Sequence, residues 1–314
     1  MRFSVLGPLA VEADDGSRLP LRRPSQRSTL AVLLLHAAQL PTRSLLIDAL
    51  WGDRPPANAE AALRVRIRDL RRALATCDRL LTHPAGYHLM VRPGELDCDS
   101  FRALAGHGRA ALDRGRAADA ARLLAQACAL WRDPPLPDLP DTPLMGVIAA
   151  TLMEEHRDAR EWLLDARLAL GHEHAIIGQI RELIAADPLR EHPYVQLMLA
   201  LYRCGEKPAA LAVYGRLRDL TGREFGMDPG PEARALLSQV LADGPALMSG
   251  SQPSGTAGQR PGRHQQGRRR VPERGRASRC SGHRRRVSGT SAGASGGTAH
   301  EGRSAGGPPG PEAR

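Results

Sequence analysis

The spacing of apolar residues predicts two successive helices between residues 42 and 75. From residue 57 to 75 an apolar residue recurs every third or fourth position and draws one stripe along a helix: Leu63, Ile67, Leu70 and Leu74. Asn58 can cap this helix, and Glu60 lies in its first turn, as the helix dipole prefers. A shorter helix, which Thr42 can cap, is predicted before it by a compact apolar face: Leu45, Leu46, Ala49 and Leu50.

The segments around these helices predict a helix-turn-helix that is followed by a hairpin. Trp51–Gly52 ends the shorter helix, and Pro55–Pro56 forces an extended turn before the longer one. Beyond the longer helix, Leu80–Thr82 and Tyr87–Met90 predict two strands, joined by the turn sequence His83–Gly86. A hairpin directly after such a helix is a wing, so this order of elements indicates a winged helix-turn-helix that binds DNA.

The residues before this module predict one more helix and a small set of strands. A helix is expected over residues 26–39, where leucines gather on one face. Three short apolar runs, separated by turn residues, predict strands before it: Phe3–Val5, Leu9–Val11 and Leu19–Leu21. The N-terminal module, residues 1–92, is therefore expected to contain three strands, three helices and two further strands.

The face of the 57–75 helix opposite its apolar stripe predicts the DNA contacts. Arginine can fork onto guanine or clamp phosphate. The alternative is the solvated basic face of an ordinary amphipathic helix, and the flanking turn and hairpin favour DNA. The helix is expected in the major groove, with the wing (residues 82–88) on the adjacent minor groove or backbone. The predicted contact residues are Arg64, Arg68, Arg71, Arg72, Ala61, Val65, His83 and Tyr87.

Five segments of the chain carry a resemblance to a known family. They are MRFSVLGPLAVE at the start, the run Val32–Ala37, IDALWGDRPP, DLRRAL and AGYHL. In combination they resemble the Streptomyces antibiotic regulatory protein family, whose DNA-binding domain is similar to the output domains of two-component response regulators. The resemblance extends to about Asp243. It implies a sequence-specific transcriptional activator of a secondary-metabolite, or antibiotic, biosynthetic gene cluster.

The resemblance also implies partners and shows one departure. A homodimer would bind promoter repeats in double-stranded DNA. RNA polymerase would contact the turn between the two helices, through Trp51, Asp53 and Arg54. The family carries a small polar residue and then arginine before the LRRAL run, where this chain has Arg68 and Asp69. An acid that faces phosphate would weaken DNA binding, and Arg68 can compensate.

The middle of the chain, residues 98–245, predicts helices arranged as a repeat. Helical faces occur at Phe101–Leu112, Ala117–Leu130, Leu144–Leu170, Ala175–Ala185, Tyr194–Arg203 and Ala209–Leu220. Gly171 and Gly205 are 34 residues apart, the tetratricopeptide period, and Gly115 opens a third similar segment. Stacked antiparallel helix pairs are therefore expected, with an irregular helical bundle as the alternative. The stretch from Glu191 onward resembles the family's bacterial transcriptional activator domain, which implies dimerisation and activation.

The net charge of +10 is unevenly distributed and marks a third region. Residues 1–92 hold 14 basic and 8 acidic side chains, whereas residues 93–248 hold 17 and 23. Residues 249–314 hold 13 and 3, and contain no Leu, Ile, Phe, Tyr or Trp, so they are expected to be disordered. This tail is interpreted as a nucleic-acid-binding arm, an inert terminus or an out-of-frame translation of GC-rich DNA, with the last favoured.

The sequence predicts a mainly α protein that binds DNA and is not an enzyme. No catalytic residues, cofactor or metal are expected. The single lysine, Lys207, precedes proline and so cannot form a phosphate-binding loop. His172–His174 is more simply a pair of surface histidines around a glutamate than a metal site. No apolar run reaches membrane length, and the five cysteines form no CxxC pair and are typical of a reducing cytoplasm, so a cytoplasmic, nucleoid-associated protein is expected. The alternative function is a helical-repeat interaction adaptor without specific DNA recognition.

Overall fold

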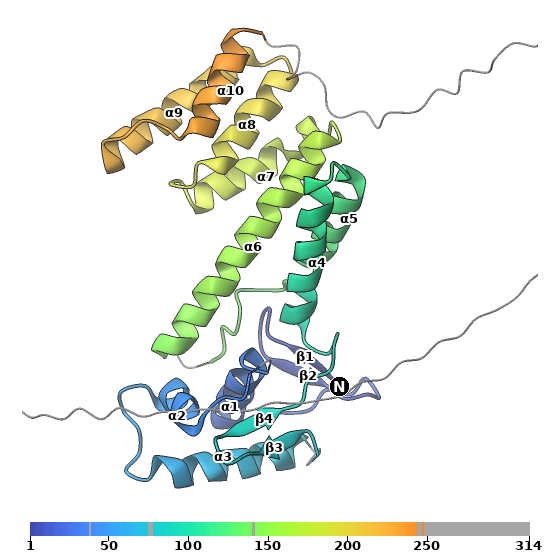
Figure 1. Cartoon of the computed structure of the whole chain (residues 1–314), viewed down its shortest axis with the longest axis vertical. Helices are drawn as coiled ribbons and strands as arrows, with labels where there is room; N and C mark the ends of the chain where they lie inside the picture. The colour runs from blue at the N-terminus through green and yellow to red at the C-terminus, as the bar shows by residue number, and fades with distance from the viewer. Residues whose placement is uncertain (38, 75–77, 140–141, 244–246, 248–314) are drawn as a thin grey trace, which may run out of the picture. The chain divides into compact units, whose positions relative to one another are not determined.

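The computed structural model describes residues 1–37, 39–74, 78–139, 142–243 and 247, and these residues are mainly helical (Figure 1). The predicted disordered tail, residues 249–314, lies outside the described residues. In chain order the elements are β1 (Arg2–Ser4), β2 (Ala10–Glu12), α1 (Pro24–Leu35), α2 (Arg43–Trp51), α3 (Ala59–Leu74), β3 (Leu80–Thr82), β4 (Tyr87–Leu89), α4 (Asp97–Asp113), α5 (Ala117–Cys128), α6 (Pro143–Ala169), α7 (Glu173–Ala186), α8 (His192–Arg203), α9 (Lys207–Phe225) and α10 (Pro231–Leu241).

The N-terminal elements form a winged helix-turn-helix, as the sequence predicts. Helices α1, α2 and α3 pack against one another, and the antiparallel β3–β4 hairpin follows α3 directly. Strands β1 and β2 form a separate antiparallel pair in which Phe3 lies opposite Val11. The helix expected over residues 26–39 is α1, which begins earlier because Pro24 suits the first turn of a helix.

The third strand expected at Leu19–Leu21 is absent from the described structure, so that prediction was wrong. Only an isolated bridge forms, between Glu12 and Arg18, and Leu19 N–H donates to the Val11 carbonyl at 2.9 Å. Pro20 follows immediately, and because proline has no N–H the ladder cannot continue through it. The segment instead passes as an irregular connection into α1.

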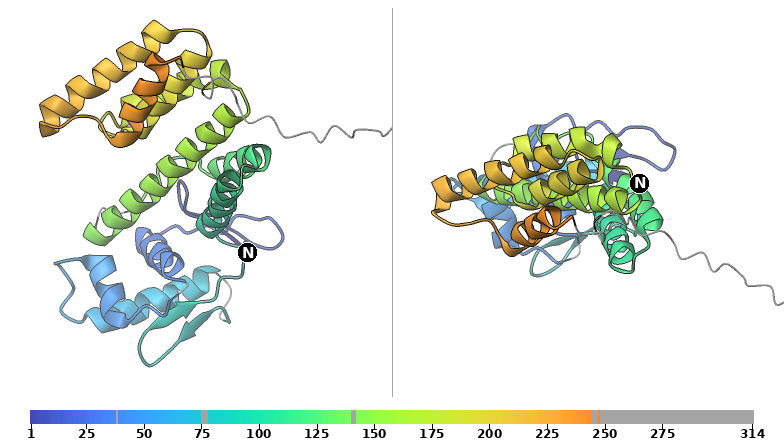
Figure 2. Two further views of the ribbon diagram at one scale, coloured as in Figure 1. Left: turned by 45° about the horizontal axis from the view of Figure 1, so that its top comes forward. Right: turned by 90° about the horizontal axis from the view of Figure 1, so that it is seen from above.

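The helical region consists of three helix hairpins, α4/α5, α6/α7 and α8/α9, with α10 packed on α8 and α9 (Figure 2). The hairpins turn at Gly115, Gly171 and Gly205, where φ lies between +70° and +82°. In each turn the glycine N–H donates to the carbonyl three residues earlier, at 2.8, 3.1 and 2.9 Å. The next N–H donates to the carbonyl five residues back, which completes a Schellman motif. The predicted repeat is therefore confirmed, and α10 is an additional helix.

The buried apolar side chains form two clusters that meet along α6. The first runs from Phe3 to Ala166 and joins the winged helix-turn-helix to α4, α5 and most of α6. The second runs from Leu164 to Leu247 and is built by the end of α6 and by α7–α10. Side-chain packing is continuous from the N-terminal module into α4–α6, so the core shows no boundary between the two regions. The predicted domain limits, residues 1–92 and 98–245, therefore stay predictions. Among the described helices, none has the length and hydrophobicity of a membrane span.

Hydrogen bonds also tie the helical region to the N-terminal module. The Asp97 carboxylate, at the start of α4, accepts the Val5 and Leu6 N–H groups at 2.8 and 3.2 Å. Thr142, which caps α6, donates its hydroxyl to the Ala49 carbonyl on α2 at 3.1 Å. Burial raises the pKa of Asp97 against the effect of these backbone donors and Arg132. The helical region is thus bonded to the winged helix-turn-helix after β1 and at α2.

An ion-pair network joins α6 to the α7–α8 loop, α8 and α10. Arg190 pairs with three acids on α6: Glu154, Asp158 and Glu161. His192 contacts Asp165 at 3.1 Å and Glu232 at 3.4 Å. Burial disfavours the charged imidazole, but these carboxylates outweigh it and raise the pKa of His192 to about 9. Charged His192 therefore stabilises the packing of α8 against α6 and α10.

This network predicts a pH-dependent stability at alkaline pH. The pKa of His192 is about 6.5 in the unfolded chain and about 9 in the folded chain. Its contribution to the free energy of unfolding is therefore complete below about pH 6.5 and is lost as the pH rises through about 9. The free energy of unfolding from urea titrations should therefore fall between about pH 7 and pH 10. His192→Gln should flatten that slope, whereas the exposed His107→Gln on α4 should keep it. An unchanged slope in His192→Gln would contradict the account.

Candidate nucleic-acid interface

Helix α3 is fixed by its buried apolar stripe and by a capped start. Leu63, Ile67, Leu70 and Leu74 are each at most 2% exposed and lie in the first core, where α3 packs on α1 and α2. The Asn58 side-chain oxygen accepts the Ala61 N–H at 3.1 Å, so the predicted cap forms. The orientation of the opposite face follows from this packing.

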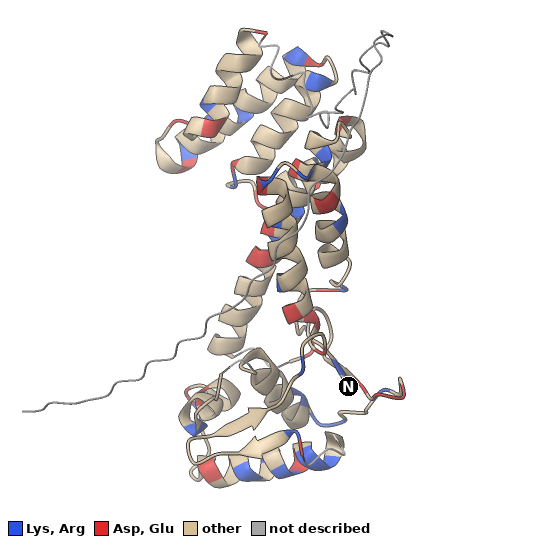
Figure 3. Ribbon diagram, turned by 45° about the vertical axis from the view of Figure 1, so that its right-hand side comes forward, with Lys and Arg blue, Asp and Glu red and all other residues tan. Residues whose placement is uncertain are grey.

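The face of α3 opposite the stripe points to solvent, as expected. Arg64, Val65, Arg68 and Arg72 are exposed, and Ala61 is partly exposed. Figure 3 shows basic residues along the outer side of α3. Val65, which is 45% exposed, lies between two arginines, so methyl groups and guanidinium groups are adjacent on this face. The DNA contacts themselves stay a prediction.

Asp69 does not stand alone on this face. Its carboxylate is 3.2 Å from the Arg23 guanidinium and 3.6 Å from that of Arg68, and its side chain is only 22% exposed. Gln26 donates to the Asp69 carbonyl at 3.4 Å, which draws this part of α3 towards α1. The negative charge therefore lies between two arginines, while compensation by Arg68 in DNA binding stays a prediction.

Arg71 has a structural role that the sequence did not predict, and its assignment as a DNA contact stays a prediction. Its guanidinium donates to the Leu80 carbonyl from Nε and Nη2, at 3.1 and 2.6 Å. Nη2 also donates to the Thr82 hydroxyl at 2.7 Å. These bonds use the donors on Nε and Nη2, so Arg71 fixes the wing relative to α3.

The wing turns at His83–Gly86 and packs against the α1–α2 connection. The His83 and Gly86 backbones exchange hydrogen bonds at 2.9 and 3.3 Å, and Arg43 N–H donates to the Ala85 carbonyl at 3.0 Å. A Cβ on Gly86 would overlap the Pro41 carbonyl oxygen, so only glycine fits this approach. The wing is thus a positioned element with His83 partly exposed near its tip.

Tyr87 is a core residue, so its assignment as a DNA contact was wrong. It is 4% exposed and shares the inward face of β4 with Leu89. Side chains two apart along a strand point the same way, so a buried Leu89 places Tyr87 inside as well. The intervening His88 bonds to the Ala37 carbonyl at 3.1 Å.

The turn between α2 and α3 presents two of the three residues assigned to polymerase. Asp53 and Arg54 are exposed, and Gly52 has a positive φ of 54° at the end of α2. Trp51 is only partly exposed, and the Arg66 guanidinium lies 4.1 Å from its ring centroid. The tryptophan therefore anchors the turn on α3 through a cation–π contact.

Two arginines that were not predicted extend the basic surface from α3 to α1. Arg22 and Arg23 are exposed just before α1 and, with Arg72 of α3, line the same shallow cavity. Asp69 also lines the cavity and pairs with Arg23 at 3.2 Å, so the positive charge of the three arginines is partly compensated there. The sequence signal is two arginines directly before a proline that can start a helix.

His172 and His174 are exposed, as the sequence predicts. Glu173 pairs with Arg203 at 3.2 Å, and His174 Nδ1 is 3.5 Å from the Cys204 sulfur. In the part of the chain that the structure describes, no group of three or more His, Cys, Asp or Glu side chains could hold a metal.

Comparison with known proteins agrees with this arrangement. A model of the C-terminal domain of transcriptional regulatory proteins matches residues 19–89, and one of the bacterial transcriptional activator domain matches residues 96–241. Transcriptional regulatory protein MoaR1 of Mycobacterium tuberculosis is 34% identical over 247 residues, 77% of this chain and 79% of MoaR1. Regulatory protein DnrI of Streptomyces peucetius is 30% identical over 257 residues, 79% of this chain and 94% of DnrI.

Comparison with solved structures also finds a similar regulator. Mycobacterium tuberculosis EmbR, in complex with a low-affinity phosphopeptide, matches with a TM-score of 0.73 and 31% identity, over 79% of this chain and 68% of that one. The fold and these matches define a winged-helix transcriptional regulator. The chain belongs to the Streptomyces antibiotic regulatory protein family.

Proposed function

We propose that this regulator activates transcription by recognising a specific duplex DNA sequence with α3, and that it acts by binding and not by catalysis. The observation that carries the proposal is the exposed row on α3 formed by Arg64, Arg68 and Arg72, opposite a fully buried stripe. Residues 1–92 carry 14 basic and 8 acidic side chains, so this module attracts phosphate while residues 93–248 repel it.

The proposed docking follows from the shapes of the helix and the grooves. An α-helix fits the major groove of B-DNA, where guanine presents two acceptors to an arginine fork. Arg68 and Arg72 are assigned to bases or adjacent phosphates, and Ala61 and Val65 to thymine methyl groups. The wing, with His83 near its tip, would lie on the neighbouring backbone or minor groove.

The proposed partners come from the family to which the chain belongs. A homodimer would bind promoter repeats of a secondary-metabolite gene cluster, which would bring the protein to the nucleoid. RNA polymerase would contact the α2–α3 turn, and the exposure of Asp53 and Arg54 supports that assignment. A helical-repeat adaptor without specific DNA recognition is the competing function, and the exposed arginine row argues against it.

The experiment that tests the proposal is selection from a random-sequence duplex library with the full chain. A recurrent sequence motif should be enriched if α3 reads bases, whereas an adaptor that binds DNA only through charge enriches none. The selected duplex then serves as the operator in binding measurements. Failure to enrich any motif from a folded protein would exclude sequence-specific recognition.

We also expect binding to the operator to depend steeply on salt. Each phosphate contact lowers log K by about 0.9 per unit of log[salt], so several contacts lower the affinity by orders of magnitude between low and physiological salt. Fluorescence anisotropy of a labelled operator gives this slope. A chain that ends at Met248 should discriminate between operator and shuffled DNA at least as well. Residues 249–314 hold 13 basic and 3 acidic side chains and contain no Leu, Ile, Phe, Tyr or Trp, so they are expected to add only sequence-independent charge. Loss of selectivity on truncation would instead make the tail a recognition arm.

A further inference from the structure

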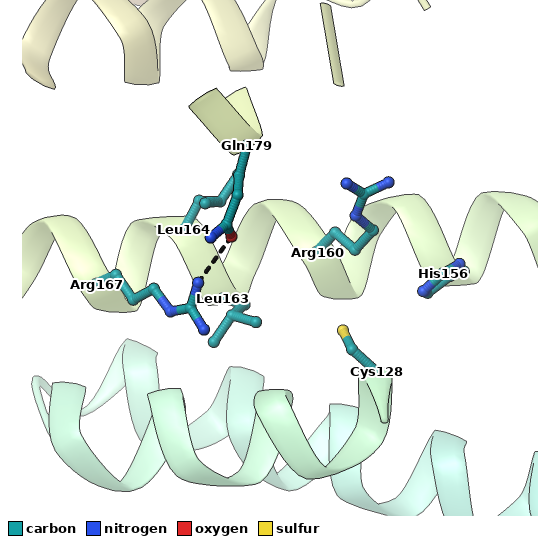
Figure 4. Close-up of a pocket in the computed structure, with 7 residues that line it drawn as sticks. All are labelled: Cys128, His156, Arg160, Leu163, Leu164, Arg167 and Gln179. Atoms are coloured by element: carbon teal, nitrogen blue, oxygen red, sulfur yellow. Dashed lines mark hydrogen bonds between the residues drawn. The ribbon is translucent and has the colours of Figure 1, made fainter. Parts of the chain in front are cut away.

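A cavity opens between α5, α6 and α7, away from the DNA-contacting surface (Figure 4). Its volume is about 310 Å³, at the small end of the range for ligand sites. Seven residues line it, five of them from α6: Cys128, His156, Arg160, Leu163, Leu164, Arg167 and Gln179. In Figure 4 Arg160 and Arg167 lie along α6, with Cys128 on one side and Gln179 on the other.

The two arginines bring weakly compensated positive charge to this cavity. Arg167 donates to the neutral Gln179 amide oxygen at 2.7 Å, and within the described residues no carboxylate lies within ion-pair distance of it. Arg160 has only a loose contact of 3.8 Å with Glu182, whose side chain is 73% exposed. Residues 93–248 hold 17 basic and 23 acidic side chains, so acidic side chains outnumber basic ones in this region. Two neighbouring arginines without a close carboxylate partner among the described residues are unusual in that setting.

The rest of the lining is apolar, aromatic and uncharged. Leu163 and Leu164 are buried, and the His156 ring stacks on Trp131 with a centroid distance of 4.2 Å and an interplanar angle of 5°. Burial and the nearby Arg160 lower the pKa of His156 to about 4, so this ring is neutral at physiological pH. Burial raises the pKa of Cys128 to about 11, which keeps it a thiol. Neither side chain supplies a counter-charge to the arginines.

We propose that this cavity binds a small organic anion, in which a carboxylate or phosphate group is carried on an apolar or aromatic body. The guanidinium groups of Arg160 and Arg167 would hold the oxyanion, since arginine binds both anion types through its planar fork. Leu163, Leu164 and the flat His156 ring would contact the body. Carboxylate and phosphate share this recognition chemistry.

The position of the cavity gives such a ligand a structural consequence. Leu163 belongs to the first core and Leu164 to the second, so the cavity lies where the two clusters meet. An occupant would contact α5, which packs in the first core, and Gln179 of α7, which packs in the second. Binding to the folded chain would therefore raise its melting temperature, independently of any DNA contact.

The test uses isothermal titration calorimetry on the full chain with four probes. These are 1-naphthoate, 1-naphthyl phosphate, inorganic phosphate and the neutral 1-naphthalenemethanol. At least one naphthyl anion should bind at one site, about tenfold or more tightly than the alcohol and inorganic phosphate, and should raise the melting temperature. The two naphthyl anions distinguish a carboxylate from a phosphate ligand. If neither binds, or if inorganic phosphate binds as well as both, the proposal falls.

Three variants locate the binding. Arg167→Gln removes one guanidinium, and Gln179→Glu places a carboxylate where the amide oxygen now accepts from Arg167. Each should weaken the anion about tenfold or more. Gln179 is exposed, so Gln179→Glu preserves the fold even if Arg167→Gln does not. Arg122→Gln on α5 is the matched control, since Arg122 is exposed and outside the cavity. Equal weakening by Arg122→Gln, or parental binding by Gln179→Glu, would overturn the proposal.

Discussion

Arg68→Ala and Arg72→Ala are each expected to weaken binding to the selected operator by about 1–3 kcal/mol, the usual worth of an arginine fork on a base. Both side chains are exposed on the face of α3 opposite the buried stripe. Their removal therefore creates no cavity, and circular dichroism should show an unchanged helix content. Anisotropy titrations against operator and shuffled duplexes measure the effect and separate loss of specificity from loss of general affinity.

The control for these variants is Arg122→Ala on α5, an equally exposed arginine outside the N-terminal module. It removes the same charge from the chain, so any effect of net charge appears in all three proteins. Arg122→Ala should bind the operator like the parent. If Arg68→Ala and Arg72→Ala also bind like the parent, the outward face of α3 does not read the operator.

Gly86→Ala is expected to cost about 2 kcal/mol or more in free energy of unfolding, as steric overlap with backbone in a packed site does. The added methyl would overlap the Pro41 carbonyl oxygen, which belongs to the backbone and cannot rotate away. The wing would have to move from the α1–α2 connection, with loss of the Arg43–Ala85 hydrogen bond. Operator affinity should fall as well, because Arg71 ties the same hairpin to α3.

Urea unfolding followed by circular dichroism measures this cost. Gly106→Ala on α4 is the matched control, since Gly106 is an exposed helical glycine with no atom within 4 Å of the added Cβ. Alanine is the better helix former there by about 1 kcal/mol, so Gly106→Ala should be neutral or stabilising. A Gly86→Ala protein that unfolds at the parental urea concentration would show that the wing does not pack as described.

Local periodicity explains how much of the fold the sequence predicts. The stripe from Leu63 to Leu74 needs only the helical repeat to place it inward, and the capping role of Asn58 depends on neighbours three residues away. The turns at Gly115, Gly171 and Gly205 are equally local, because a left-handed residue that ends a helix favours glycine. These features are encoded within a few residues of chain.

The role of Arg71 was missed because it depends on a contact between distant segments, whereas the errors at Leu19–Leu21 and Tyr87 have local causes. Arg71 sits on α3 beside three other arginines, and only the position of β3 shows that its donors go to Leu80 and Thr82. Leu19–Leu21 has the apolar pattern of a strand, but Pro20 interrupts the ladder. For Tyr87 the information was present, since alternation along β4 places it on the same face as the apolar Leu89.

The cavity between α5, α6 and α7 likewise could not be predicted from the sequence. Arg160 and Arg167 are seven residues apart on one helix, which the sequence presents as ordinary surface arginines. Cys128 and Gln179, from α5 and α7, meet them only because three helices pack together. Arg22 and Arg23 likewise join Arg72 only through the packing of α1 on α3. The spacing of these residues along the chain therefore predicts neither cavity.

The most direct test of the account is protection of guanine N7 from dimethyl sulfate on the selected operator. N7 lies in the major groove, where α3 is proposed to bind. The account predicts that the parent protein protects specific guanines and that Arg68→Ala or Arg72→Ala restores the reactivity of some of them, while Arg122→Ala changes none. Full reactivity of every guanine under saturating parent protein, or protection that both α3 variants retain, would contradict recognition by α3.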